Sequence, residues 1–343
     1  MTFAVTAGKR RARYIARVMD AAAVLRTFVV RFARTSAGQI RGTVEQVRTG
    51  RRELIQTMED IGRVIAAMVL RTEEDTMSFK GKHALVTGGS RGIGRGIAVK
   101  LAESGARVAI HYYANQAAAK ETLERVRKHG ADGFLVQADV SRMEDVQRMF
   151  GEVRQAFGTL DIFVANARPE AAKFYQKPMD ISLEAWDHAM DSQAKAFLVG
   201  VREAVPIMSQ GGRILAITYA PGGQKGTWQP WVAMGSAKAA LESLVRYFAV
   251  TLAPHGITVN SVSPGLTDDS VLNSFPQAAV DAARSWHASG WTPMGRMGTP
   301  ADIGNVVALL CSPDAGWITG QLIHADGGAS LVDTHLPLEM QRG

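Results

Sequence analysis

Apolar and polar residues alternate differently in two regions of the chain. From Phe79 onward, short runs rich in β-branched residues alternate with segments whose apolar residues recur every three or four positions. This alternation predicts a doubly wound α/β domain, in which helices cover both faces of a parallel sheet of about seven strands. We expect strands at His83–Thr87, Arg107–His111, Gly133–Gln137, Leu160–Ala165, Gly212–Thr218, Thr258–Val262 and Leu322–His324. We expect helices near residues 93–104, 115–129, 142–157, 184–209, 232–254 and 300–311.

Residues 1–76 are interpreted as an all-helical amphipathic extension in front of this domain, which spans residues 77–343. One predicted helix covers residues 8–34, and Ser36-Ala37-Gly38 is the expected break after it. In the second predicted helix, apolar residues follow steps of four and three, as in a heptad seam that Arg51 interrupts. That seam comprises Ile40, Val44, Val47, Leu54, Met58, Ile61, Ile65 and Met68.

The positive charge of the chain is concentrated in this first region. The net charge is +7, and residues 1–76 hold 14 Lys and Arg against 8 Asp and Glu, while the remainder holds 25 against 24. The main domain is therefore nearly neutral, and we expect no nucleic-acid partner for it. Charged residues such as Arg17, Asp20 and Arg26 interrupt the first predicted helix, which argues against a transmembrane span.

Four interpretations of the extension stay open. The helical pair packs on its own domain or on another subunit, binds a membrane surface, or directs the chain to an organelle, or the segment is an upstream extension of little structure. We favour the first, with a cytoplasmic protein that is at most peripherally membrane-bound. Cys311 is the one cysteine, so the chain requires no oxidising compartment, and neither it nor the histidines show metal-ligand spacing. We therefore expect no metal site.

A glycine-rich turn follows the first predicted strand of the main domain. The strand ends at Thr87, and a helix opens at Ile93. Glycines at such a turn let the backbone approach a pyrophosphate, and the start of the helix supplies free N–H groups and the positive end of its dipole. A glycine motif in this context predicts a Rossmann-type dinucleotide site. Its expected cofactor-binding residues are Gly88, Ser90, Arg91, Gly92, Ile93 and Gly94.

Two features of the sequence favour NADPH over NADH. Sites for NAD usually carry an acidic residue at the end of the second strand, where it binds the ribose 2′-hydroxyl. Here that strand ends in Tyr112-Tyr113-Ala114-Asn115 without an acid. Arg91, inside the glycine loop, can face a 2′-phosphate instead.

The motifs beyond the loop resemble the short-chain dehydrogenase/reductase family. They are Ala138-Asp139-Val140, Val164-Ala165-Asn166-Ala167, Gly235-Ser236-Ala237-Lys238-Ala239, Val259-Asn260 and Pro264-Gly265. The resemblance covers about residues 78–332, and Met234-Gly235 with Arg246-Tyr247 is most similar to the enoyl-acyl-carrier-protein reductase branch. It implies an NADPH-dependent oxidoreductase that forms a homodimer or homotetramer through helices near 184–209 and 232–254. The further cofactor residues that it implies are Asp139, Val140, Asn166, Ala167, Lys238, Pro264, Gly265 and Thr267.

The catalytic positions depart from the family's Asn, Ser, Tyr and Lys. The Asn position corresponds to Gln193, and the Ser position to Tyr219. The Tyr position becomes Met234 at a spacing of four before Lys238, or Trp231 at the spacing of seven that the enoyl reductase branch uses. The usual acid is thus absent at either spacing, and the catalytic candidates are Tyr219, Trp231, Lys238 and Gln193.

Asp269 is a further departure, because it stands where the family usually places a threonine near the pyrophosphate. A carboxylate there repels a phosphate, so we expect Asp269 to point away or its loop to be rearranged. Residues 267–298 correspond to a substrate lid in this family. Phe275, Trp286, Trp291 and Met294 give that segment an apolar character, which favours a greasy substrate.

The surviving residues suit reduction of C=C better than reduction of C=O. Ketone reduction forms an alkoxide that needs a proton donor, and the indole of Trp231 is no practical acid. Hydride addition to an enoyl thioester forms an enolate, which needs hydrogen-bond donors first, and Tyr219 and Trp231 can supply two. We expect a small-molecule or carrier-bound acyl substrate. The alternatives are a carbonyl reductase that uses Tyr219 as acid, and a dinucleotide-binding protein without redox turnover.

Overall fold

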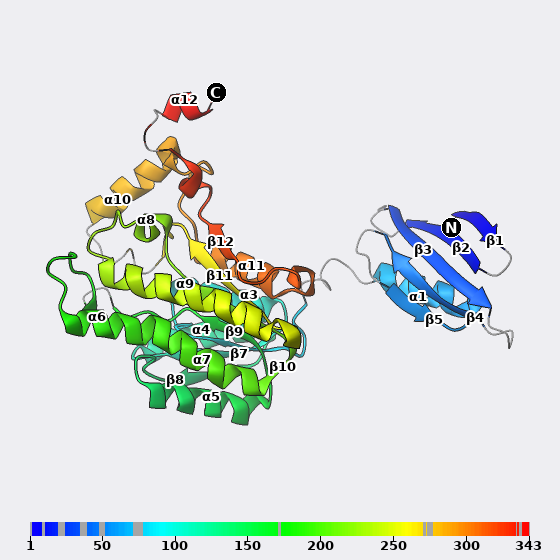
Figure 1. The fold of residues 1–343 in the computed structure, drawn as a ribbon, viewed down its shortest axis with the longest axis horizontal. Coiled ribbons are helices and arrows are strands. Elements are labelled where there is room, and N and C mark those ends of the chain that lie inside the picture. Colours follow the sequence, from blue (N-terminus) through cyan, green and yellow to red (C-terminus); the bar gives the residue numbers. More distant parts are fainter. Residues whose placement is uncertain are drawn as a thin grey trace. The chain divides into compact units, whose positions relative to one another are not determined.

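The computed structural model describes residues 2–8, 11–19, 25–34, 40–47, 52–70, 78–170, 173–269, 272, 277–333, 335 and 338–342. The chain divides into two compact units, Met1–Thr76 and Met77–Gly343, which are drawn from blue to red along the sequence in Figure 1. Each unit has its own sheet, and each is described separately below.

The larger unit contains a seven-stranded sheet in which every pairing is parallel. The strands lie in the order β12-β11-β10-β9-β6-β7-β8. All seven predicted strands are present, so the predicted doubly wound α/β fold is confirmed. Their bounds are β6 His83–Val86, β7 Arg107–Tyr112, β8 Gly133–Gln137, β9 Leu160–Ala165, β10 Met208–Ile217, β11 Thr258–Pro264 and β12 Leu322–Ala325.

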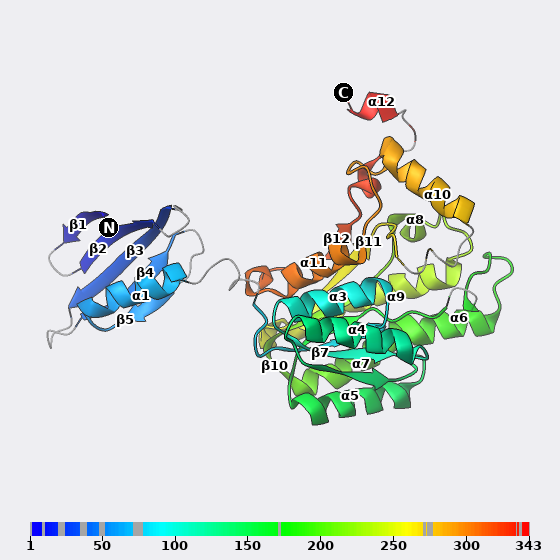
Figure 2. The same cartoon turned by 180° about the vertical axis from the view of Figure 1, so that it is seen from behind.

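Helices cover both faces of this sheet, as two views from opposite sides show (Figures 1 and 2). Alternate strand residues belong to two separate apolar clusters, one packed on α5, α7 and α9 and the other on α3, α4 and α11. The predicted helix 184–209 is divided by a π-helical turn at Asp191–Lys195. The helices are α3 Gly92–Glu103, α4 Gln116–Lys128, α5 Met143–Phe157, α6 Leu183–Met190, α7 Ala196–Ala204, α8 Pro221–Gln224, α9 Val232–Leu252, α10 Gln277–Trp286, α11 Pro300–Cys311 and α12 Leu338–Arg342.

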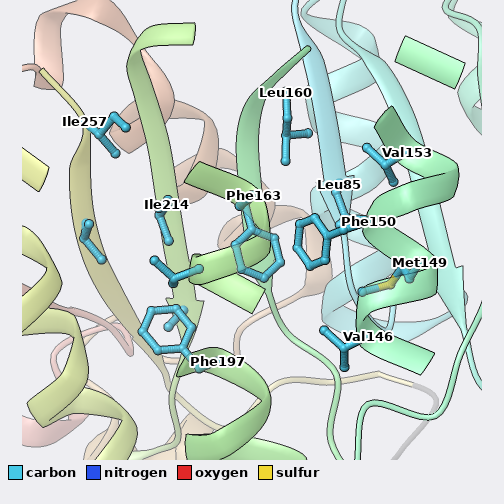
Figure 3. Packing of buried hydrophobic residues seen from close by; sticks show 14 of the residues in the cluster. Leu85, Val146, Met149, Phe150, Val153, Leu160, Phe163, Phe197, Ile214 and Ile257 are labelled. Carbon is cyan, nitrogen blue, oxygen red and sulfur yellow. The ribbon is translucent and has the colours of Figure 1, made fainter. Parts of the chain in front are cut away.

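Aromatic rings form the centre of the first cluster, which Figure 3 shows from close by. Phe150 of α5 meets Phe163 of β9 edge to face, with ring centroids 5.3 Å apart. Gly200 of α7 leaves the space for this pair, because a Cβ there would lie 2.9 Å from Cζ of Phe163. This packing holds α5 and α7 against the sheet and fixes the height of β9, whose carboxyl end carries Asn166.

Chain order reverses between β6 and β9. From β6 the sheet continues in one direction through β7 and β8, and from β9 in the other through β10, β11 and β12. Ligands of doubly wound sheets bind outside the carboxyl ends of the strands at such a switch point. The glycine loop follows β6 and Asn166 follows β9, so both stand at this crevice.

In its described residues the smaller unit has a five-stranded antiparallel sheet and one helix, so the predicted all-helical extension is wrong. Residues 8–34 contain no helix in their described part. Only the end of the second predicted helix is helical, as α1. The Ser36–Gly38 break lies outside the described residues. The elements are β1 Thr2–Gly8, β2 Arg11–Met19, β3 Leu25–Arg34, β4 Ile40–Gln46, β5 Arg52–Ile55 and α1 Met58–Leu70.

A period of two in β3 explains the error. Phe28, Val30 and Phe32 belong to one cluster with α1, while Arg31 between them is exposed and pairs with Glu45 of β4. Val30 lies opposite Val44 in the antiparallel ladder. Residues four apart share one face of a strand as well as one face of a helix, so the spacing suits both structures. The expected membrane-surface or partner-helix contact stays a prediction, and α1 is the helix that the described residues of this unit offer for it.

Two further observations concern membrane crossing and the single cysteine. None of the helices in the described residues combines the length and the apolar character that crossing a bilayer requires. Cys311 ends α11 as a buried thiol, and burial raises its pKa to about 12.

Candidate active site

A cavity of about 1080 Å³ opens at the carboxyl ends of the strands, at the predicted crevice. Every predicted cofactor-binding residue lines it, from Gly88 in the glycine loop to Thr267 after β11. Tyr219, Trp231, Met234 and Lys238 line it as well. The structure therefore brings the glycine loop and the catalytic candidates to one space. In the described part of the chain, no three His, Cys, Asp or Glu side chains gather in a way that could hold a metal.

Glycine is required at two places in the loop. A Cβ on Gly94 would lie 2.1 Å from the carbonyl oxygen of Gly88, and one on Gly88 would lie 2.9 Å from Cα of Ala167. Gly88 also has a φ of 64°, which favours glycine. The loop is thus closed tightly against the end of β9, and the first N–H groups of α3 stand at its rim, as a diphosphate requires.

Buried side chains hold the loop in this shape. The N–H of Gly88 donates to Nδ1 of His111 at 2.9 Å, and Nε2 of His111 lies 3.1 Å from the carbonyl oxygen of Ala138. Burial lowers the pKa of His111 to about 4, which keeps the ring neutral and able to accept. Asn166 donates from Nδ2 to the carbonyls of Thr87 at 2.9 Å and Gly88 at 3.2 Å. The support that His111 gives to the cofactor loop is a role that the sequence did not reveal.

The adenosine end of the cavity is basic and aromatic. Arg91 lies there with Tyr113 and Asn115, and the acidic residue that NAD sites usually carry at this strand end is replaced. Lys173, which follows β9, also lines the cavity, and its Nζ stands 5.7 Å from the centre of the Tyr113 ring. Arg91 and Lys173 are two cations at the place where a 2′-phosphate would lie. The sequence does not reveal Lys173, because it lies 58 residues beyond Asn115 in the chain.

Lys238 and Tyr219 define the reaction end. The ammonium of Lys238 is buried and donates to the carbonyl oxygen of Ile217 at 2.5 Å. Burial lowers its pKa to about 7, and the charge of Arg168 lowers it further, while Glu242 opposes both. The hydroxyl of Tyr219 donates to the carbonyl oxygen of Gly235 at 3.1 Å. Burial and the neighbouring Glu242 raise the pKa of Tyr219 to about 12.

An aromatic cluster places Trp231 at the start of α9. Its ring centroid lies 5.2 Å from that of Phe174, 5.8 Å from that of Trp228 and 6.3 Å from that of Tyr175. The main chain around Trp231 is fixed as well, because it pairs with Gln176 in an isolated bridge. Met234 is buried one turn further along α9 and contacts this cluster. The cluster makes the reaction end apolar, in keeping with a greasy substrate.

Gln193 stands behind the cavity wall. It is buried in the π-helical turn, and its Nε2 donates to the carbonyl oxygens of Ser192 at 2.8 Å and Ala167 at 3.2 Å. Its neighbour Ser192 lines the cavity instead. Gln193 therefore positions the backbone of Ala167, one residue past Asn166, and does not itself line the cavity.

Of the two expectations for Asp269, the one that its side chain points away is wrong, and the rearranged loop stays a prediction. Its carboxylate points into the glycine loop, because a Cβ on Gly92 would lie 2.5 Å from Oδ2 of Asp269. Backbone anchors on both sides of this residue explain the orientation. The N–H of Asp268 donates to the carbonyl oxygen of Gly298 at 2.8 Å, and that of Leu272 donates to the carbonyl oxygen of Asp269 at 3.1 Å.

Comparisons with known proteins agree with this geometry. Residues 88–330 match the family model described as "Enoyl-(Acyl carrier protein) reductase". The chain is 38% identical to 1-cyclohexenylcarbonyl-CoA reductase of Streptomyces collinus, over 73% of this chain and 87% of that protein. It is 34% identical to tetrahydroxynaphthalene reductase of Pyricularia oryzae, over 74% and 91%. The crystal structure of the angucycline C-6 ketoreductase LanV with bound NADP has a TM-score of 0.67 at 38% identity, over 74% and 98%.

The chain belongs to the short-chain dehydrogenase/reductase family. The predicted family and the predicted class of enzyme, an oxidoreductase, are both confirmed by these matches. The matched relatives cover about three quarters of the chain, and the match to the family model extends from the glycine loop past β12.

Proposed function

We propose that the protein reduces the C=C bond of an enoyl thioester or enone with NADPH as its cofactor. The site fits this cofactor: glycines leave the diphosphate space, α3 offers its N–H groups, and Arg91 with Lys173 stands at the 2′-phosphate end. Solved relatives carry NADP, which supports the same choice. When bound, NADPH supplies the hydride that adds to the β-carbon of the substrate.

The observation that carries the proposal is that Tyr219 and Trp231, two hydrogen-bond donors, line the cavity together with Lys238. Burial raises the pKa of Tyr219 to about 12, so its hydroxyl is a hydrogen-bond donor at neutral pH and a weaker acid than that of an ordinary tyrosine. An enolate oxygen needs a donor and no immediate proton, whereas an alkoxide needs an acid. Tyr219 therefore suits the first intermediate better than the second.

The remaining residues have positioning and binding roles in this mechanism. Lys238, a compact cation with three donors, would hold the nicotinamide ribose hydroxyls. The indole N–H of Trp231 is the second donor to the thioester carbonyl. For Tyr219 to be the first, its one hydroxyl hydrogen must leave the carbonyl of Gly235, which substrate binding at the apolar cluster would promote.

Carbonyl reduction is the second candidate, because several relatives are named for it. The structures of LugOII and of the angucycline C-6 ketoreductase are titled for keto-reduction, while 1-cyclohexenylcarbonyl-CoA reductase is named for an unsaturated thioester. In this interpretation Tyr219 is the acid despite its raised pKa. A third candidate is a dinucleotide-binding protein without redox turnover, which the missing acid favours.

One assay separates the three. The protein is mixed with NADPH and either a crotonyl thioester or a β-ketoacyl thioester, and the NADPH absorbance is followed. We expect loss with the crotonyl thioester alone. Loss with the ketoacyl thioester alone would establish the second candidate, and NADPH binding without loss in either mixture would establish the third.

We also propose a homodimer or homotetramer formed through α9. Tyr247 and Val250, on this long helix, are 73% and 79% exposed, and large apolar side chains on a solvent face favour burial against a second copy. Sedimentation of the full chain and of its Tyr247→Glu variant tests this. The charge should reduce the mass to that of a smaller species, and an unchanged mass would argue against α9 as the interface.

A further inference from the structure

The start of α3 already has an anion beside it. Gly92 is the first residue of this helix, and Oδ2 of Asp269 lies where a Cβ on Gly92 would be 2.5 Å away. The first N–H groups of a helix have no partners within the helix, and its dipole attracts negative charge there. The Asp269 carboxylate thus stands in the region where the glycine loop would hold a diphosphate.

The loop that carries Asp269 is anchored to the lid. The carboxylate of Asp268 accepts from both Nε and Nη2 of Arg284 on α10, each at 3.1 Å. The bridge between Thr267 and Gly298 fixes the other side of the loop. These anchors leave Asp268 facing the lid and Asp269 facing the cavity, so the placement of the carboxylate is built into the backbone.

Arg168 is the cation that interacts with this carboxylate. Arg91 and Lys238 line the same cavity. Desolvation lowers the pKa of the Arg168 guanidinium, and Asp269 is the largest charge that opposes this, so the two side chains interact. Arg168 directly follows Asn166-Ala167, at the carboxyl end of β9. A diphosphate at α3 would meet the same donors and the same guanidinium, and would be repelled by the carboxylate.

We propose that Asp269 is an internal competitor of the cofactor diphosphate at the start of α3. In the free protein its carboxylate holds the anion position and is the counter-ion of Arg168. NADPH binding turns Asp269 away, and Arg168 then becomes a ligand of the diphosphate. Asp269 therefore sets the affinity for the cofactor, and Arg168 is a diphosphate-binding residue.

Fluorescence titration of the full chain with NADPH, without substrate, tests this inference. Asp269→Asn removes the charge at nearly constant shape, and we expect its Kd for NADPH to fall about tenfold or more below that of the unchanged protein. Asp314→Asn is the matched control, because it removes the same charge from an exposed position outside the cavity, and its Kd should stay within twofold. Arg168→Ala should weaken binding about tenfold in the Asp269→Asn background.

The thermal midpoint supplies a second readout. Asp269→Asn should lower the thermal midpoint of the free protein, because the internal anion is lost. It should also enlarge the rise in midpoint that NADPH produces, because the diphosphate then binds more tightly. An equal or weaker NADPH affinity of Asp269→Asn would overturn the inference while leaving the cofactor assignment intact. Binding in neither protein would instead overturn the NADPH-dependent function on which the inference rests.

Discussion

The two ends of the cavity obey different constraints. At the cofactor end, the backbone itself is the ligand, and Gly88, Gly94, His111 and Asn166 fix its course through close contacts and buried hydrogen bonds. At the reaction end, side chains supply the groups that would contact the substrate. Tyr219, Trp231 and Met234 stand there where the family has other residues. A backbone ligand tolerates almost no substitution, whereas a side-chain ligand can be exchanged while the fold persists. The difference predicts that damage at one end abolishes binding and damage at the other abolishes turnover.

The largest effect is expected for Gly94→Ala. The new Cβ would lie 2.1 Å from a backbone oxygen, so the loop must open, and we expect NADPH affinity to fall at least about 100-fold. Gly151→Ala in α5 is the matched control, because a Cβ there meets nothing within 4 Å and Ala is the better helix former. Titration of both variants, with circular dichroism to verify folding, makes the comparison. Equal affinities would show that the loop is not the diphosphate site.

The next effect concerns the reaction end alone. Tyr219→Phe removes one donor to the developing oxyanion, and such a loss lowers turnover about 100-fold. The Kd for NADPH should stay within twofold, because the hydroxyl bonds to Gly235 and belongs to no part of the loop. Steady-state kinetics and titration separate the two quantities. A turnover number that does not change would remove Tyr219 from the mechanism.

Lowering the pH should reduce the folding stability through His111, which supports the cofactor loop. The pKa of His111 is about 4 in the folded protein against 6.5 for an ordinary histidine, so the unfolded state binds more protons between these values. The resulting stability is complete above pH 6.5 and is lost as the pH falls toward 4, with a loss of roughly 2 kcal/mol by pH 5. Urea unfolding at pH 7 and pH 5 measures it. In His111→Gln, the pH-dependent part of the loss should be smaller.

The smallest expected effect sharpens the choice of cofactor. Arg91→Ala should reduce the preference for NADPH over NADH about tenfold, because one charge-assisted contact to the 2′-phosphate is lost. Affinity for NADH is the internal control and should not change. The ratio of the two dissociation constants is the measurement, and an unchanged ratio would leave Lys173 as the better candidate for the 2′-phosphate.

The sequence was most informative where local spacing determines structure. The glycine loop and the seven strands follow from contacts within a few residues or within one strand–helix unit, whereas Lys238 was identified through the family resemblance. It was least informative for the smaller unit, where Val30 meets Val44 through antiparallel pairing and helix and strand periods coincide at steps of four. Asp269 could not be placed because its orientation depends on Gly298 and Arg284, which lie 15 or more residues away.

Because α3 and α11 are in close contact, the reactivity of the lone thiol can measure how often this part of the fold opens. A Cβ on Gly96 would lie 2.2 Å from the carbonyl oxygen of Pro300, so the helix that carries the diphosphate site rests directly on the helix that ends at Cys311. A thiol with a pKa of about 12 is almost entirely unreactive at neutral pH while it stays buried. Alkylation of the Cys311 thiol therefore requires α11 to open. The alkylation rate reports the free energy of this local opening, in the helix that packs against α3.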